Sequence, residues 1–165
     1  IMNKKLELPK VGARIQKTAL SVFICMIIPH LLNMEYPFYA CIAAVICLKD
    51  SHENTVKMGV NRMIGTLIGG CAGILSTFLF LKFNNYYFEC IVTSLLCIVV
   101  IYICKVLKKP GSVTIACIVL LANTLLIKQE PNYIYTINRI IETFIGIIVA
   151  TLVNRFIFPY KKDEK

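Results

Sequence analysis

Three charged side chains stand in or beside long apolar runs of the sequence. Arg139 and Glu142 lie three residues apart in "NRIIETFIGI", and Arg62 leads into the apolar part of "NRMIGTLIGG". An arginine in apolar surroundings attracts anions, and a carboxylate one helical turn away can pair with it or carry a proton. Both interpretations of the Arg139–Glu142 pair are open on the sequence alone. Ionisable groups within apolar helices are functional candidates by default, so these three residues come first.

The two quoted segments are near-copies of each other. Asparagine, arginine, isoleucine, threonine and glycine recur in register at a spacing of 77 residues: Asn61/Asn138, Arg62/Arg139, Ile64/Ile141, Thr66/Thr143, Ile68/Ile145 and Gly69/Gly146. The repeated phrase predicts two helices of related structure, each with an arginine near its start.

Composition decides the solvent in which these helices lie. Of the 165 residues, 58% are hydrophobic and only 16% are charged, and the mean hydropathy is +0.73. Ordinary globular chains have roughly 45–50% apolar and about 25% charged residues. Several long stretches contain no charge at all: Thr18–Met34, Met63–Leu81, Cys90–Cys104 and Pro110–Ile127. The sequence therefore predicts an integral membrane protein, and helices are expected because lipid cannot satisfy exposed backbone groups.

We predict an all-α membrane domain over residues 17–158 with six transmembrane helices, at 17–34, 36–49, 62–81, 86–105, 111–128 and 139–158. The second is the weakest, because its charge-free part is short; it is a short or tilted helix or half of a re-entrant hairpin. Residues 1–16 are expected to form a basic helix on the cytoplasmic surface, and residues 159–165 a cytoplasmic tail.

The repeated phrases begin the third and the sixth predicted helices, so the repeating unit contains three helices. The first repeat covers about residues 17–81 and the second about 86–158. Because three is odd, the second copy must lie upside down relative to the first. Such inverted repeats are typical of secondary transporters, whose substrates pass at the interface between the repeats.

The distribution of basic residues predicts the orientation. Of the 18 Lys and Arg residues, 15 fall in the N-terminal arm, the second and fourth connections and the tail, and three fall on the other side: Lys82, Lys128 and Arg139. This asymmetry follows the positive-inside rule and predicts cytoplasmic N- and C-termini in the cell membrane. The net charge of +9 then indicates contact with anionic lipid headgroups and no nucleic-acid partner.

Other residues have a packing role and a possible functional role. Glycines or alanine recur every four residues in the third and sixth helices, which predicts close packing of these helices against each other or between two subunits: Gly65, Gly69, Gly73, Gly146 and Ala150. Arg14 and Lys17 either anchor the first helix to phospholipid or gather cytoplasmic anions at the entrance of a pathway. Tyrosines near the outer ends predict an aromatic belt, and each can also stack on an aromatic substrate.

The sequence does not favour an enzyme, a metal site or a cofactor. All eight cysteines fall within or beside apolar runs, none has CxxC spacing, and no acidic residue or histidine stands ready to complete a ligand set. They are best interpreted as small apolar side chains. Two histidines and scattered carboxylates do not supply the clustered acid and base that intramembrane catalysis needs.

Four segments together resemble the membrane domain of the bacterial aromatic acid exporter family, which is related to the fusaric acid resistance proteins. They are "GARIQKTALSVFI", "YPFYACIAAVI", "NRMIGTLIGGCAG" and "NRIIETFIGIIVATLVNRFIFP". The resemblance covers roughly residues 10–160. It implies a multi-pass inner-membrane protein of six helices that forms a dimer and moves organic anions out of the cell.

We therefore predict a transporter or channel component that exports organic carboxylates, including aromatic ones. Arg14 and Lys17 would concentrate the anion, Arg62 and Arg139 would flank its path, and Glu142 would couple protons. On this interpretation, Arg139→Ala or Glu142→Gln would abolish efflux. The alternative is a non-transporting structural or assembly subunit. A polar cavity that reaches these residues would favour transport, and a dry seam packed with glycines would favour the structural role.

Overall fold

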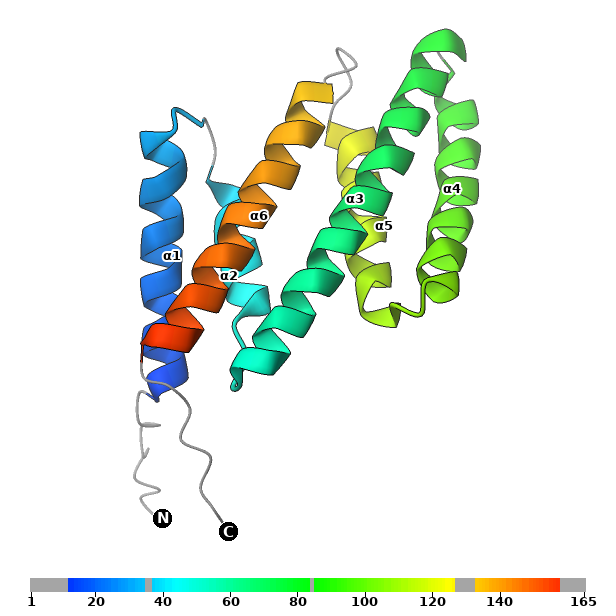
Figure 1. Cartoon of the computed structure of the whole chain (residues 1–165). Helices are drawn as coiled ribbons and strands as arrows, with labels where there is room; N and C mark the ends of the chain where they lie inside the picture. Colours follow the sequence, from blue (N-terminus) through cyan, green and yellow to red (C-terminus); the bar gives the residue numbers. More distant parts are fainter. Residues whose placement is uncertain (1–11, 35–36, 84, 127–132, 158–165) are drawn as a thin grey trace, which may run out of the picture.

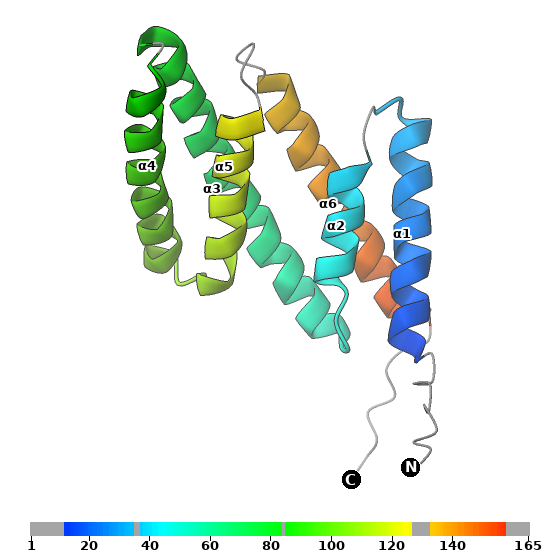
Figure 2. The same cartoon turned by 180° about the vertical axis from the view of Figure 1, so that it is seen from behind.

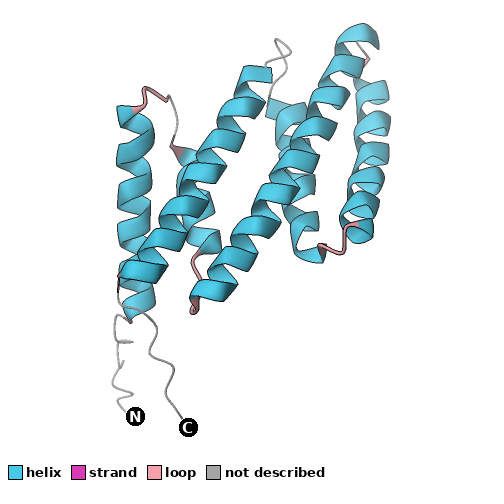
Figure 3. Cartoon of the chain, viewed as in Figure 1, coloured by secondary structure: helices cyan, strands magenta, loops and turns pink. Residues whose placement is uncertain are grey.

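The computed structural model describes residues 12–34, 37–83, 85–126 and 133–157. Within these ranges it consists of helices and loops, with no strand (Figure 3). The elements in chain order are α1 (Ala13–Leu31), α2 (Phe38–Cys47), α3 (His52–Phe83), α4 (Tyr86–Val106), a short 3-10 turn η1 (Pro110–Ser112), α5 (Val113–Leu126) and α6 (Tyr133–Phe156). The predicted all-helical class and the order of six helices are confirmed.

Two long helices, α3 and α6, contact each other at the centre and run in opposite directions along the chain (Figure 1). The shorter helices α2 and α5 lie on one face of this central pair, α2 against α6 and α5 against α3 (Figure 2). Helix α1 packs beside α2 and α6 at one edge, and α4 packs beside α3 and α5 at the other edge. Each edge of the bundle therefore has one long inner helix, one short helix and one outer helix.

The six helices differ in how far they can reach. Helices α3 and α4 and the segment Ile134–Phe156 of α6 are long and apolar enough to cross a membrane. Helix α2 has 10 residues and α5 has 14. At 1.5 Å per residue these lengths are about 15 Å and about 21 Å, against a hydrocarbon core of about 30 Å. The expectation of a short second helix agrees with α2, and α5 is short as well.

Two helices extend beyond the predicted transmembrane segments at their N-terminal ends. Helix α3 begins at His52, before the predicted segment at 62–81, because the second connection is itself helical and continues into the apolar segment. Its start is capped by Ser51, whose Oγ accepts a hydrogen bond of 3.2 Å from the amide of Asn54. Helix α6 begins at Tyr133 instead of residue 139, so Arg139 lies within the helix. Residues 1–11 of the surface helix predicted at 1–16 lie outside the described residues. The predicted tail at 159–165 lies outside them as well.

The predicted glycine contact between α3 and α6 is wrong in its partners. A Cβ on Gly65 would lie 2.7 Å from the carbonyl oxygen of Ser112, and one on Gly69 would meet that of Ala116, so these glycines pack on η1 and α5. Gly73 lies against Asn123, which is also on α5. Helix periodicity reveals a face of small residues, but it does not reveal which neighbour that face meets.

The small residues of α6 pack on α2 in the same way. A Cβ on Gly146 would meet the carbonyl oxygen of Ala40 and would lie 2.7 Å from the Cβ of Ala43. Ala150 is fully buried in the adjoining core with Ala44 and Cys47. The direct α3–α6 contact involves other glycines instead, since a Cβ on Gly59 would lie 2.6 Å from the side chain of Ile147. Small residues thus allow each short helix to pack closely against a long one.

Replacing Gly146 by alanine should destabilise the protein. The added methyl group would collide with the carbonyl oxygen of Ala40, which is backbone and cannot rotate away. We expect a loss of about 1–3 kcal/mol, seen as a lower midpoint of thermal unfolding in detergent. Gly12→Ala is the matched control, because a Cβ there has no atom within 4 Å. Equal midpoints for the two variants would contradict the proposed close contact between α6 and α2.

Candidate functional site: a cavity with two buried arginines

A cavity of about 560 Å³ lies between the two short helices and the central pair. Most of its wall is apolar. Helix α2 contributes Phe38, Tyr39, Ile42 and Ile46, and α5 contributes Thr114, Ile115, Ile118, Val119 and Ala122. The size is in the range of ligand-binding pockets, which combine apolar walls with a few fixed polar groups.

The polar groups of this cavity include two arginines and their neighbouring threonines. Arg62 and Thr66 come from α3, and Arg139 and Thr143 come from α6, so each pair is four residues apart on one helical face. The structure thus brings together the two arginines that the sequence singled out, from helices that run in opposite directions.

Both guanidinium groups are buried without a full set of partners. Arg62 is 7% exposed and Arg139 is 6% exposed. The Nε of Arg62 and the Nη1 of Arg139 are buried and have no hydrogen-bond partner. Among the described residues, neither arginine forms an ion pair within 4 Å. Removing a charge from water costs several kcal/mol unless a counter-charge or hydrogen bonds replace the lost hydration. Both arginines that line the cavity therefore retain one guanidinium donor for which the described residues supply no acceptor.

Glu142 lies close to this cavity but is not part of its wall. Its Oε2 accepts a hydrogen bond of 3.2 Å from the backbone amide of Tyr39, near the start of α2. Arg139 lies instead over the ring of Tyr39, with 4.1 Å from Cζ to the ring centroid, and the hydroxyl of Tyr39 is hydrogen-bonded to that of Tyr135. The ion pair expected as one reading of Arg139 and Glu142 is absent from the described contacts.

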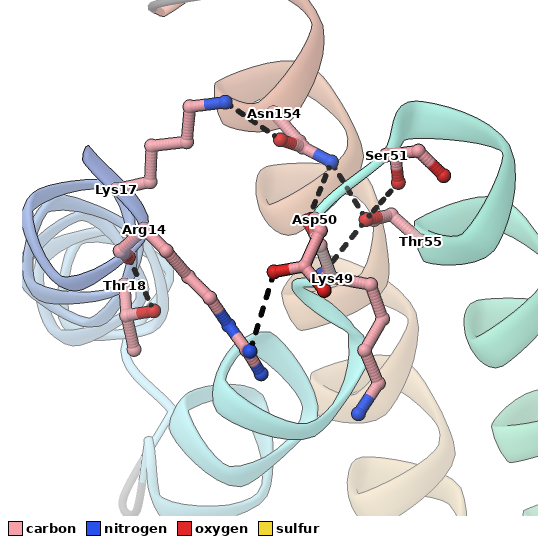
Figure 4. A network of polar contacts seen from close by, with 8 residues as sticks. All are labelled: Arg14, Lys17, Thr18, Lys49, Asp50, Ser51, Thr55 and Asn154. Atoms are coloured by element: carbon pink, nitrogen blue, oxygen red, sulfur yellow. Dashed lines mark hydrogen bonds and ion pairs between the residues drawn. The ribbon is translucent and has the colours of Figure 1, made fainter. Parts of the chain in front are cut away.

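Lys17 is not part of the cavity wall. It lies in a second polar cluster (Figure 4). It is 5% exposed, and its Nζ donates a hydrogen bond of 2.9 Å to Oδ1 of Asn154. The Nδ2 of Asn154 donates to the carbonyl of Lys49 at 3.1 Å and to Oγ1 of Thr55 at 2.8 Å. This cluster connects α1, α6 and the connection between α2 and α3. Lys17 is thus a buried connecting residue in this structure, not an exposed lipid anchor.

Arg14 lies at the exposed rim of the same end of the bundle. Its Nη1 is 3.3 Å from Oδ1 of Asp50, and both side chains are largely exposed. An exposed ion pair of this kind contributes little to stability. Of the five predicted site residues, the structure therefore brings Arg62 and Arg139 into one cavity, places Glu142 beside it, and places Arg14 and Lys17 at another level of the bundle.

Sequence analysis missed the walls that α2 and α5 contribute. A signal for them exists, because "FYACIAAVIC" at 38–47 and "TIACIVLLAN" at 114–123 share Ala-Cys-Ile in register at a spacing of 76. The same spacing relates the cavity-lining positions on these helices: Phe38/Thr114, Tyr39/Ile115, Ile42/Ile118 and Ile46/Ala122. Three identical apolar residues are too weak a match to stand out in an apolar chain, whereas arginine, asparagine and glycine are conspicuous.

Comparison with known proteins gives the family. The family model described as "Aromatic acid exporter family member 1" matches residues 9–157, which is most of the chain. The chain belongs to the aromatic acid exporter family. The match spans all six helices of this exporter-family chain, including both arginines of the cavity.

Several curated relatives of this exporter-family chain carry the label UPF0421. A UPF0421 protein of Bacillus cereus is 29% identical over 160 residues, which are 96% of this chain and 43% of the relative. UPF0421 proteins of Staphylococcus saprophyticus and Staphylococcus epidermidis are 26% and 27% identical and cover 92% and 97% of this chain. The chain spans less than half the length of these relatives. No solved structure matches it.

Proposed function

We propose that this chain is part of an exporter of organic carboxylates, including aromatic ones, and that the cavity between α2, α3, α5 and α6 binds the anion during export. Membership of the aromatic acid exporter family supports export as the activity. The observation that carries the proposal is the pair of buried arginines, Arg62 and Arg139, that line one cavity with unused hydrogen-bond donors.

The chemistry of the cavity suits an anion with one carboxylate and an apolar body. Arginine presents a planar fork of donors that matches a carboxylate, and an interaction of this kind is strongest in dry surroundings. The remaining walls offer aliphatic side chains and the rings of Phe38 and Tyr39, against which a hydrocarbon or aromatic body can lie. A highly charged or strongly hydrated anion would lose its hydration here without comparable gain.

The inverted-repeat arrangement is part of the proposal. Helices α3 and α6 run in opposite directions, and each packs through a glycine on one short helix (Figure 1). Equivalent positions from both halves line the cavity, as expected for a substrate site at the interface of inverted repeats. We further propose that both termini are cytoplasmic in the cell membrane, which rests on the distribution of Lys and Arg.

The rival function is a structural or assembly subunit without transport. Glycine-packed seams are present, at α3–α5 and at α6–α2, and these alone would fit the rival. A purely structural subunit, however, has no use for two incompletely paired guanidinium groups beside an open cavity. This favours transport over the structural alternative.

Removing either cavity arginine should stop export. We expect Arg62→Ala and Arg139→Ala to reduce the efflux of radiolabelled benzoate from proteoliposomes at least about tenfold, since each removes a charged hydrogen-bond donor to the carboxylate. Arg155→Ala is the matched control, because Arg155 is an exposed residue at the other end of α6 and its loss changes the net charge equally. If all three variants transported benzoate like the wild type, the cavity would not be the export site.

The proposed orientation can be tested with a pair of exposed lysines at opposite ends of the bundle. In a cysteine-free background, Lys82→Cys should react with an impermeant maleimide added outside cells, because Lys82 lies in the last turn of α3, at the proposed outer end. Lys108→Cys should react only after the membrane is opened, because it lies in a cytoplasmic connection. Both side chains are exposed, so burial does not bias the comparison. Labelling of both from the same side would contradict the orientation.

A further inference from the structure

The two cavity arginines are held in different ways, although they occupy matching positions of the repeated phrases. The guanidinium of Arg139 lies over the ring of Tyr39. Arg62 has no such ring contact among the described residues, and its Nε is left without a partner. The difference must come from the residues that surround each arginine.

The register between the two halves identifies those residues. Gly69 packs on Ala116 and Val119, and Gly146 packs on Ala40 and Ala43. The short-helix partners are thus 76 residues apart, while the glycines are 77 apart. In this register Ile115 corresponds to Tyr39, and Gly65 corresponds to Glu142.

The matching contact in the first half leaves no room for a carboxylate. A Cβ on Gly65 would lie 2.9 Å from the Cβ of Ile115, so the backbone of α3 lies directly against the start of α5. In the second half the same position is Glu142, and its side chain bridges from α6 to α2. In the first half, α3 and α5 therefore meet through close backbone packing at this position. In the second half, α6 and α2 are joined here by a hydrogen bond.

The hydrogen bond from Tyr39 to Glu142 satisfies a need of the short helix. Tyr39 is in the first turn of α2, where backbone N–H groups have no partner within the helix. The N-cap residue, Pro37, provides no side-chain hydrogen bond. Glu142 supplies the missing acceptor from another helix, and its negative charge lies at the positive end of the helix dipole.

We propose that Glu142 is a positioning residue, which fixes the start of α2 through the amide of Tyr39 and thereby holds the ring on which Arg139 lies. This inference rests on the proposed function of the cavity. Tyr39 is the connecting residue, because its amide bonds Glu142, its ring lies under Arg139 and its hydroxyl bonds that of Tyr135. In the cavity, the guanidinium of Arg139 is held against the ring of Tyr39, whereas that of Arg62 has no such ring contact among the described residues. The carboxylate acts as an acceptor and carries no proton for export.

Two substitutions at Glu142 distinguish a role as hydrogen-bond acceptor from a role as proton carrier. Glutamine keeps an oxygen that can accept from the amide of Tyr39 but cannot carry the proton, whereas leucine has a similar size and no acceptor. We expect Glu142→Leu to weaken the binding of benzoate to the purified protein about tenfold or more, since a buried hydrogen bond to a charged group is lost. Glu142→Gln should restore most of that affinity, with the pH profile of the wild type.

The effect should pass through Arg139. In an Arg139→Ala background, Glu142→Leu should change the affinity for benzoate less than about twofold, because the positioned group is already absent. Independent effects of the two substitutions would contradict the role of Tyr39 as the connection. A Glu142→Gln protein with affinity as low as Glu142→Leu, or with a flattened pH profile, would overturn the inference and favour proton coupling.

A second measurement does not depend on any anion. Hydrogen exchange of the first turn of α2 should be faster in Glu142→Leu than in wild type, and near wild type in Glu142→Gln, because the acceptor protects the amide of Tyr39. Unchanged exchange in Glu142→Leu would overturn the inference. If the wild type bound no benzoate, the proposed function would fail, while hydrogen exchange would still decide the role of Glu142.

Discussion

The cost of keeping two positive charges out of water is the constraint around which this bundle is organised. Arg62 and Arg139 are each more than nine-tenths buried, and each guanidinium retains an unused donor. A penalty of several kcal/mol per buried ion is large against the typical net stability of about 5–15 kcal/mol. A carboxylate ligand would supply the missing partner. The cost of the two buried charges and the anion affinity that we propose for the cavity would thus have one cause.

The packing of the helices explains why a cavity exists at that place. Gly69 and Gly146 let the backbones of α5 and α2 approach the long helices, so α5 packs closely on α3 and α2 packs closely on α6. The two short helices then lie on the same face of the central pair (Figure 2). The cavity lies between them. At the far end, the Lys17–Asn154 cluster ties α1, α6 and the α2–α3 connection together (Figure 4). The glycine contacts and the Lys17–Asn154 cluster hold the helices together, and they do so without filling the cavity with core side chains.

Much of this could be predicted from the sequence, for identifiable reasons. Charge-free runs gave the helices, and the rare residues of the repeated phrase paired Arg62 with Arg139. What failed were contacts between side chains distant in sequence. Lys17 shares a face with Arg14 by local spacing, yet its partner is Asn154 on the last helix. Glu142 lies one turn from Arg139, yet its oxygen serves the amide of Tyr39. Periodicity specifies a face of a helix, and only the packed structure specifies what meets it.

The most direct test is the thermal unfolding of the purified protein with and without benzoate, compared with an Arg62→Met variant. The wild-type midpoint should rise with benzoate concentration, by an amount equivalent to about 2.7 kcal/mol at a hundred times the dissociation constant. Arg62→Met should unfold at the same or a higher temperature without benzoate, because an incompletely paired buried charge is removed, and benzoate should no longer raise its midpoint. A variant that unfolds several degrees lower yet keeps the full benzoate shift would show that Arg62 is structural and that the anion binds elsewhere.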